Sequence, residues 1–365
     1  MTRREFILST FSSMIAFGIF GCETAKNKFH FKNSPKKITN VVDQLRWIDD
    51  RRRFELSQNE ENKSAIELNK LIPEIDSIEL SNSYSSEPGE NLRIISWNTQ
   101  RGRHWRKGFR LISEHPYLKN PDIILLGEMD LGMARSGNDH TTKELADALR
   151  MNYIYGVEFL ELTNGEAGER EKYPGENEWG YHGNAILSKY PLHNPRMIRF
   201  PDIEIWYQHY QKRLGGRMAL FAEVKINGQR ITFVSTHLES SDDKSKIRQN
   251  QMKMILNECD KVESNLPIII GGDFNAAPDE PLFNVLRNSG FVVDKCNDMG
   301  QPTQQIFKDG QVQLIKKQID YIVVRNLSVI SDKTSPQVVP AAYPIAKDGK
   351  ILGDHAIVTV KVKPT

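Results

Sequence analysis

Short apolar runs, separated by polar and glycine-containing segments, recur along the chain from residue 92 onward. Runs of roughly four to eight apolar residues between turn residues are typical of buried strands. The pattern predicts strands at 92–97, 123–126, 185–187, 219–226, 231–235, 268–270, 319–324 and 356–362. Asn227 and Gly228 separate two of these runs, and this dipeptide is a strong signal for a β-hairpin.

Other segments repeat apolar residues every three or four positions, which predicts amphipathic helices. Helices are expected over 142–151 and 245–262. Pro281 is expected to open a short helix, because proline fits the first helical turn. Hairpins mixed with crossover helices are typical of mixed sheets covered by helices, so the pattern predicts an α/β fold.

Residues 1–22 follow a different pattern. Arg3 and Arg4 precede an apolar run that ends at Phe20, and its ~15 residues fall short of the ~20 that a membrane-spanning helix needs. This combination is typical of an export signal, and the arginine pair resembles a twin-arginine signal. Cys22 follows the run as in a lipoprotein cleavage site, so a lipid on Cys22 is a candidate membrane tether. We expect an exported protein that is periplasmic, attached to the cell envelope or secreted; a plain signal peptide or an uncleaved anchor is the alternative.

A segment with helical periodicity separates this signal from the first predicted strand. Residues 26–37 are basic and polar, as a tether would be. Apolar residues at helical spacing over 41–75 predict one or two amphipathic helices. Residues 81–89 are rich in serine and end in Pro-Gly, which predicts a linker. Whether the helical part packs on the main domain or contacts a partner stays open.

Composition narrows the class of protein. The 365 residues include 49 Lys+Arg and 47 Asp+Glu, a net charge of +2, which argues against a protein that coats DNA through excess basic residues. Three cysteines and 39% apolar residues exclude a disulfide-stapled miniprotein and low-complexity disorder. We divide the chain into a signal peptide (1–22), a tether and helical preface (23–90) and a main domain large enough for an enzyme (91–365).

Polar side chains that bind metals or transfer protons stand at the ends of the predicted strands, in segments far apart in the chain. They are Asn98, Glu128, His237, Asp273, Asn275, Asp320, Asp354 and His355. Singly, an Asp or Asn after a strand is usually a turn residue or a helix cap. Glu128 is harder to explain in this way, because an unpaired carboxylate in an apolar run is costly to bury. If Glu128, Asp273 and Asp354 converge, Mg²⁺ or Mn²⁺ would balance them, because hard cations prefer oxygen ligands.

These segments resemble the endonuclease/exonuclease/phosphatase superfamily, which has a deoxyribonuclease-I-like fold. The matching segments are 95–98, 126–128, 183–188, 235–238, 271–275, 319–321 and 353–355, in the family's order. Gly127 departs from the family, which often has glutamine before the acidic ligand. The resemblance implies an α/β sandwich of two sheets in four layers, with helices on the outer faces. It also implies hydrolysis of a phosphate ester by metal-activated water at one edge of the sandwich.

The resemblance further implies a role for each matching residue. Glu128 is the principal metal ligand, with Asn98 beside it and Asp354 as a further carboxylate on the metal side. Asp273 orients or deprotonates the attacking water, and Asn275 holds the nucleophile or a phosphoryl oxygen. A metal cation near a phosphodiester reduces the repulsion between the anionic substrate and the nucleophile.

Two histidines complete the implied machinery. His355, held by Asp320, contacts the phosphate, and His237 donates to a phosphate oxygen or assists the leaving group. Such donors stabilise charge that develops on the phosphoryl oxygens. The candidates for substrate contact are Asn184, Arg217 and Arg248, and for the two arginines a structural role is an equal alternative.

Three functions compete for this scaffold. The first is a nuclease that cuts phosphodiesters, and the second is a hydrolase of small or lipid-linked phosphate esters, sphingomyelinase-like or acting on sugar phosphates. The third, an inactive surface binding protein, is disfavoured because every expected polar position is filled.

Two segments bear on the substrate. Basic residues and a tryptophan at 100–107 favour a nucleic-acid partner, and a solvated loop before a helix is the alternative for this segment. The acid-rich segment 158–178 would repel a long polyanion. We predict a Mg²⁺- or Mn²⁺-dependent phosphodiesterase, with nuclease slightly ahead; its substrate, number of metal ions and oligomeric state stay open.

Overall fold

The computed structural model describes residues 34–58, 65–165, 167–240, 242–261, 265–309, 311–330, 336–342 and 351–364. Residues 34–365 form one compact unit. The predicted export signal and the candidate lipid site at Cys22 lie outside the described residues, so export and lipid attachment stay predictions. Among the described residues, no helix combines the length and the apolar character needed to cross a membrane.

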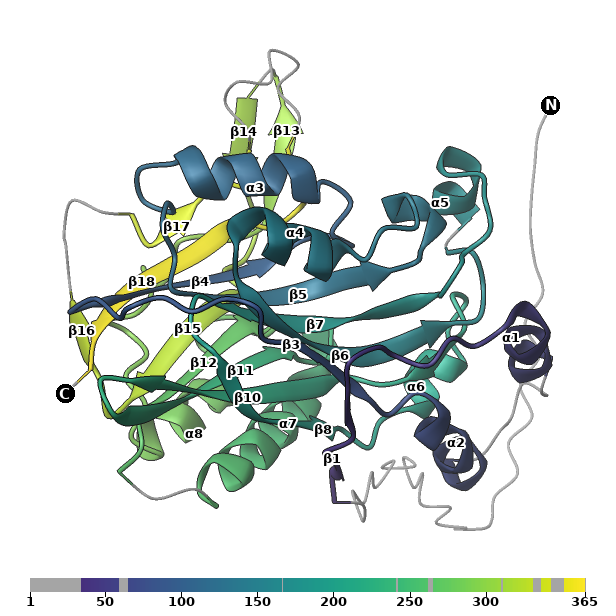
Figure 1. Cartoon of the computed structure of the whole chain (residues 1–365), viewed down its shortest axis with the longest axis horizontal. Helices are drawn as coiled ribbons and strands as arrows, with labels where there is room; N and C mark the ends of the chain where they lie inside the picture. The colour runs from purple at the N-terminus through teal and green to yellow at the C-terminus, as the bar shows by residue number, and fades with distance from the viewer. Residues whose placement is uncertain are drawn as a thin grey trace, which may run out of the picture. The chain divides into compact units, whose positions relative to one another are not determined.

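Two β-sheets form the centre of this unit (Figure 1). The larger, ten-stranded sheet has the order β16 (Ser328–Ile330), β18 (Ile357–Lys363), β4 (Leu92–Asn98), β5 (Ile123–Leu131), β7 (Tyr181–Ser188), β6 (Asn152–Glu161), β3 (Ile78–Ser81) and β2 (Val41–Val42), with β17 (Val338–Val339) on β18 and β9 (Arg213–Gly215) on β6. The six-stranded sheet has the order β1 (Lys36–Ile38), β8 (Leu192–Arg199), β10 (Met218–Ile226), β11 (Gln229–His237), β12 (Ile268–Asp273) and β15 (Asp320–Arg325). All the strands predicted from the apolar runs are present.

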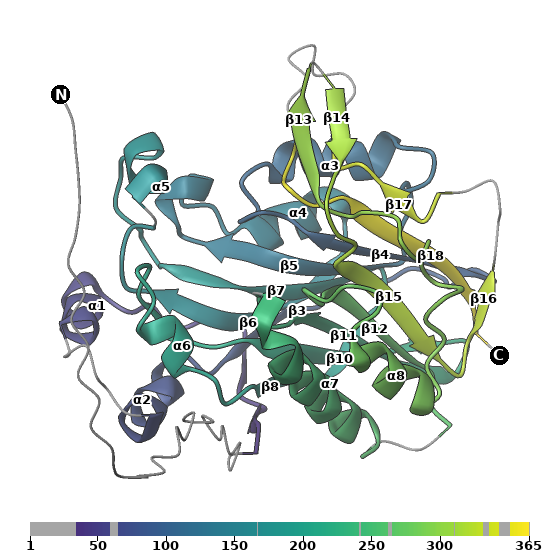
Figure 2. The same ribbon diagram turned by 180° about the vertical axis from the view of Figure 1, so that it is seen from behind.

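Apolar side chains fill the space between the two sheets. Helices cover both outer faces (Figures 1 and 2). On the outer side of the ten-stranded sheet lie α3 (Trp105–Glu114) and α4 (Thr141–Leu149). On the outer side of the six-stranded sheet lie α7 (Ser245–Cys259) and α8 (Pro281–Asn288). The four-layer sandwich is therefore confirmed, because each sheet buries one face against the other sheet and one against helices.

The preface departs from its prediction in detail. Lys36–Ile38, which we assigned to the tether, forms β1 and pairs with β8. The two helices are present as α1 (Asp50–Ser57) and α2 (Ala65–Leu71), but they start later because Val41–Val42 pairs with β3 as β2. Leu56 and Leu68 of these helices are buried in the same apolar cluster as strands β5 and β7. Of the two roles left open for this segment, the structure shows packing on the main domain.

The remaining elements complete the chain. They are η1 (Ile72–Glu74), η2 (Ala134–Ser136), α5 (Ala167–Lys172), α6 (Glu204–Tyr207), η3 (Asp242–Lys244) and the hairpin of β13 (Gln305–Lys308) and β14 (Gln311–Leu314). Both views show this hairpin projecting beside α3 (Figures 1 and 2). It begins next to the predicted site, since the Gln305 amide donates to the Asp354 carbonyl at 2.8 Å.

The first acids of the acid-rich segment 158–178 lie inside the protein rather than in an exposed insert. Glu158 and Glu161 lie in β6, where both are buried. Arg217 donates to Glu158 at 2.7 Å, and Arg213 lies 3.1 Å from Glu161. Buried carboxylates need such partners because their desolvation is otherwise too costly. The charge of these two acids is therefore neutralised inside the protein, which removes part of the argument against an anionic polymer.

Candidate active site

Strand register brings the predicted polar residues together at one end of both sheets. His237 of β11 pairs with Asp273 of β12, and Asp273 pairs with Asp320 of β15, so the three lie in one row. Asn98 ends β4 in the other sheet. Its Nδ2 donates to Asp273 Oδ2 at 3.1 Å and thereby joins the two sheets.

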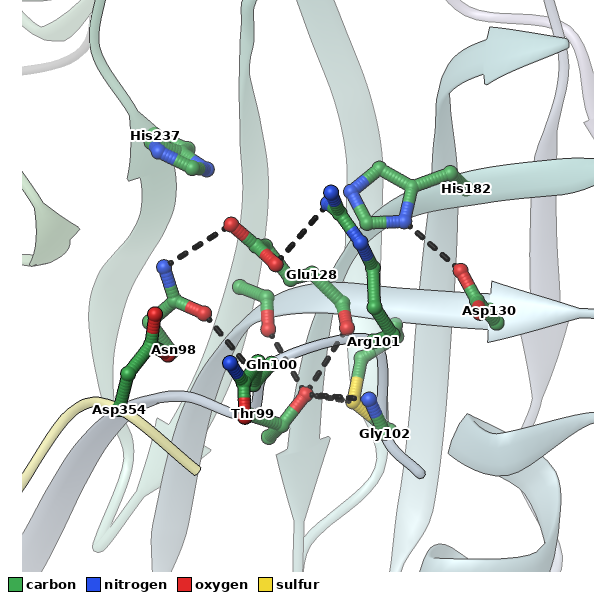
Figure 3. Close-up of polar contacts among 12 residues, drawn as sticks. Asn98, Thr99, Gln100, Arg101, Gly102, Glu128, Asp130, His182, His237 and Asp354 are labelled. Atoms are coloured by element: carbon green, nitrogen blue, oxygen red, sulfur yellow. Dashed lines mark hydrogen bonds and ion pairs between the residues drawn. The ribbon is translucent and has the colours of Figure 1, made fainter. Parts of the chain in front are cut away.

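Glu128 reaches this end through a bulge in β5. The register between β5 and β7 shifts between Leu126 and Met129, and Glu128 has a left-handed φ of 57°. A non-glycine residue in this conformation costs of order 1–3 kcal/mol and is concentrated at functional sites. Its Oε1 accepts from Asn98 Nδ2 at 3.2 Å and its Oε2 from Arg101 Nη1 at 3.0 Å (Figure 3). Burial alone would raise the pKa of Glu128, but the positive charge around it, chiefly that of Arg101 with smaller effects of nearby histidines, holds the pKa well below its usual range, so this carboxylate is ionised.

Asp273 occupies the centre of the site. Its Oδ1 accepts from the Asn275 amide at 2.8 Å, and its Oδ2 lies 3.4 Å from His237 Nε2 and 3.8 Å from His355 Nε2. Burial, and then the nearby Asp320 charge, raise the pKa of Asp273 to about 7. A carboxylate with this pKa is suited to general-base catalysis near neutral pH. The Asn275 side chain instead donates to the Leu238 carbonyl at 3.1 Å.

The two histidines differ in charge: His237 is neutral and His355 is a cation. Arg217 Nη1 lies 2.8 Å from His237 Nδ1, and a guanidinium can only donate, so Nδ1 of His237 carries no proton. Burial and the Arg217 charge hold the pKa of His237 well below its usual range, which leaves a neutral ring with Nε2–H as donor. His355 Nδ1 donates to Asp320 Oδ2 at 2.8 Å. Burial would lower the pKa of His355, but the Asp320 carboxylate raises it well above its usual range, so His355 is a cation.

The oxygen-rich side of the site fits a hard divalent cation. Glu128, Asp354 and Asp273 offer carboxylates, and burial followed by the Glu128 charge among other effects raises the pKa of Asp354, as expected where carboxylates lie close together. Donor atoms of Asp273, Asp320 and His355 also lie within 4.8 Å of one another. A protonated imidazole is no ligand, and Nδ1 of His355 already donates to Asp320. The residues therefore favour a cation on the Glu128 and Asp354 side.

Of the three predicted substrate contacts, the structure brings one directly to the site. Among the described residues the buried Asn184 Oδ1 has no hydrogen-bond partner, and a Cβ on Gly127, the neighbour of Glu128, would lie 3.8 Å from it. Arg217 is buried, and its Nη1 lies 2.7 Å from Glu158 Oε1 and 2.8 Å from His237 Nδ1, so it contacts a site residue. Arg248 does not reach the site: it is fully buried and lies 2.6 Å from Glu280.

We expect Arg248→Met to destabilise the protein by about 3 kcal/mol, because breaking a buried ion pair leaves Glu280 without its cation. Urea denaturation of the variant and the wild type measures this difference. The affinity for inorganic phosphate should stay unchanged, and a weakened phosphate affinity in the folded variant would restore the predicted role of Arg248 in substrate contact.

Sequence reasoning did not place two groups beside Glu128. One is Arg101, which it included only in the basic segment 100–107. The other is a second Asp–His pair, in which His182 Nδ1 lies 2.8 Å from Asp130 Oδ1 (Figure 3). Asp130 is also bound by Arg135, whose Nε donates at 2.8 Å. A charged residue two positions after Glu128 in an apolar run was a signal for this pair. Its partner could not be inferred, because His182 comes from another strand.

Comparison with solved structures shows the class of fold. An endonuclease/exonuclease/phosphatase from Beutenbergia cavernae DSM 12333 superposes with a TM-score of 0.52 and 17% identity, over 76% of this chain and 72% of that one. The human Nocturnin catalytic domain, solved with a bound sulfate anion, gives the same TM-score of 0.52 and 17% identity, over 77% of this chain and 97% of that one. At these identities the likeness concerns the fold.

The family follows from the sequence. The Endonuclease/Exonuclease/phosphatase family matches residues 95–355, and the chain belongs to this family. Tyrosyl-DNA phosphodiesterase 2 from Gallus gallus is 30% identical over 125 residues, which are 33% of this chain and 31% of that protein. Protein angel from Drosophila melanogaster is 23% identical over 206 residues, 55% of this chain and 50% of that protein. The chain thus spans a third to a half of the length of these relatives.

Proposed function

We propose that this protein is a divalent-metal-dependent hydrolase of phosphate esters, and specifically a phosphodiesterase. The observation that carries the proposal is Asp273, a buried carboxylate with a pKa near 7 that faces both a neutral and a cationic histidine. Membership of the Endonuclease/Exonuclease/phosphatase family supports it. The similarity to a tyrosyl-DNA phosphodiesterase, over part of its length, favours a phosphodiester over a monoester.

The residues divide the reaction among them. Ionised Asp273 removes a proton from the attacking water, while Asn98 holds Asp273 beside Glu128. His355, as a cation, binds a non-bridging oxygen of the phosphoryl group, and His237 donates its Nε2–H to a second oxygen or to the leaving group. A bound Mg²⁺ or Mn²⁺, held by Glu128 and Asp354, would supply Lewis-acid stabilisation of the phosphoryl charge.

A nucleic-acid phosphodiester is our first choice of substrate. The internal neutralisation of Glu158 and Glu161 supports it, since these acids do not repel a polyanion. Trp105 argues in the other direction, because its indole nitrogen donates to Asp139 and the ring is only partly exposed for stacking. Small or lipid-linked phosphate esters are therefore the alternative.

We expect the purified protein to lose hydrolytic activity in EDTA and to regain it with Mg²⁺ or Mn²⁺, because oxygen ligands select hard cations. The assay compares plasmid DNA, RNA, sphingomyelin, a sugar-phosphate panel and bis(p-nitrophenyl) phosphate. Circular dichroism in EDTA serves as the control for folding. Cleavage of lipid but not nucleic acid would replace the first substrate with the alternative, and metal-independent cleavage would contradict the proposal.

A further inference from the structure

The guanidinium of Arg101 lies beside Glu128 and has no role in the reaction as described above. Its Nη1 donates to Glu128 Oε2 at 3.0 Å (Figure 3). Its Nε lies 3.8 Å from Oε1 of Glu169 in α5. Its Nη2 has no hydrogen-bond partner among the described residues, and this nitrogen is not buried. Arg101 thus presents an unused pair of N–H donors at the edge of the site.

An unusual backbone conformation at residues 100–102 sets the direction of the Arg101 side chain. Gln100, Arg101 and Gly102 have consecutive left-handed φ values of 50°, 73° and 64°. This conformation is unfavourable for the two side-chain-bearing residues, so neighbouring contacts must impose it. The Gly102 amide donates to Thr99 Oγ1 at 3.0 Å, and that hydroxyl donates to the Glu128 carbonyl at 2.9 Å. The loop is therefore fixed by the same strands that carry the metal-side residues.

The other acids near Arg101 have cations of their own. Arg135 binds Asp130 at 2.8 Å and Glu169 at 3.2 Å, and Arg213 binds Glu161 at 3.1 Å. Arg101 is therefore not needed to neutralise them. A divalent cation on Glu128 would also satisfy that carboxylate, which would leave the Arg101 charge available to an anion.

We propose that Arg101 is a further catalytic residue, which binds a non-bridging oxygen of the phosphoryl group undergoing hydrolysis. A guanidinium suits this task because its planar fork matches phosphate oxygens and stays charged at any working pH. Held by Glu128 and the strained loop, it needs little reorganisation when the substrate binds. The inference rests on the proposed function, since it assigns Arg101 to the substrate of that same site.

The opposite view is that Arg101 only balances Glu128, and the two views predict different responses to Arg101→Met. If Arg101 binds phosphate, the variant loses phosphate affinity but keeps or gains affinity for Mn²⁺, because a competing positive charge has left Glu128. If Arg101 is purely structural, the metal-side carboxylates lose their positions and both affinities fall together.

The experiment measures Mn²⁺ binding by electron paramagnetic resonance and inorganic phosphate binding by calorimetry in saturating Mn²⁺. We expect Arg101→Met to weaken phosphate binding about 10- to 100-fold, as expected for loss of a charge-assisted hydrogen bond. Arg101→Lys should recover part of this affinity. Arg106→Met is the matched control, because Arg106 lies nearby, is 71% exposed and pairs with Asp139; it should change phosphate binding by less than about twofold.

Four results bear on the inference and on the proposed function. Unchanged phosphate affinity in Arg101→Met, or joint loss of Mn²⁺ and phosphate binding in both Arg101 variants, would overturn the inference. An equal effect of Arg106→Met would also overturn it, since general attraction would then explain the binding. If the wild type binds phosphate through Arg101 but hydrolyses no phosphate ester, phosphate contact by Arg101 stands and the proposed function fails.

Discussion

Asp273→Asn should lower kcat for phosphate-ester hydrolysis about 10²- to 10⁴-fold, the range expected when a general base is removed. Asparagine has nearly the same shape, and its carbonyl oxygen can still accept from the Asn275 amide. Its amide nitrogen cannot take a proton from water, and it meets the Nε2–H groups of His237 and His355 as another donor. Steady-state kinetics with saturating Mg²⁺ measures the loss.

The stability of the same variant, relative to the wild type, should rise with pH. Burial and Asp320 raise the pKa of Asp273 to about 7, so the folded protein holds this proton to a higher pH than the unfolded chain, in which aspartate titrates near ~4. Ionisation of Asp273 therefore opposes folding increasingly from about pH 4 to above 7, and asparagine removes this effect. The Tm of metal-free Asp273→Asn minus that of the metal-free wild type should accordingly be more positive at pH 8 than at pH 5.

The exposed Asp294 provides a matched control for this pair of measurements, since it is 61% exposed and pairs with Arg287 away from the site. Asp294→Asn should leave kcat unchanged and should not raise Tm. Undiminished kcat in folded Asp273→Asn would remove Asp273 from the role of base. A Tm that falls in parallel with activity would show that the loss comes from damage to the fold.

Asp320→Asn should move the alkaline limit of activity to lower pH and reduce kcat at pH 8 by about 10²- to 10³-fold, as when the carboxylate that orients a catalytic imidazole is replaced. The Asp320 carboxylate, together with Asp273 and Asp354, outweighs burial and raises the pKa of His355, so His355 stays a cation up to high pH. Without the Asp320 charge the pKa of His355 falls, and His355 loses its proton at lower pH. Since the cation is the active form, activity disappears earlier as the pH rises.

The pH dependence of kcat/KM, together with the NMR titration of His355, tests this expectation. Glu79→Gln is a suitable control, because Glu79 Oε1 lies 3.1 Å from His140 in a carboxylate–histidine pair outside the site. In that variant kcat/KM should fall at the same alkaline pH as in the wild type. If kcat/KM of Asp320→Asn also falls at the wild-type pH, the protonation of His355 does not limit the reaction.

The strand-end residues could be predicted from sequence because they depend on short-range rules. His237, Asp273 and Asp320 each end or begin an apolar strand, and strand ends meet at sheet edges. The arginines could not be assigned in this way. Arg101 is aimed by three left-handed residues, and Arg248 faces inward from α7 toward Glu280 on the next helical segment. A long side chain reaches partners that are set by tertiary packing, and these leave no local pattern.

The missed strands have a similar explanation. All ten residues of β6 are buried, but Glu158 and Glu161 interrupt its apolar pattern and made its second half resemble an acidic insert. Their partners, Arg217 and Arg213, lie more than fifty positions further along the chain. A strand that contains buried ion pairs of this kind cannot be predicted by a rule that uses only the hydrophobicity of its residues.

The two short strands β1 and β3 have a consequence for how this protein can be shortened. β1 pairs with β8 at one border of the six-stranded sheet, and β3 pairs with β6 near one border of the ten-stranded sheet. A chain that starts at residue 91 would leave the backbone N–H and C=O groups of β8 and β6 uncovered, and such edges promote self-association through intermolecular strand pairing. The segment that carries β1, β2 and β3 thus covers these strand edges within the same chain and opposes aggregation. A soluble fragment of this protein should retain it.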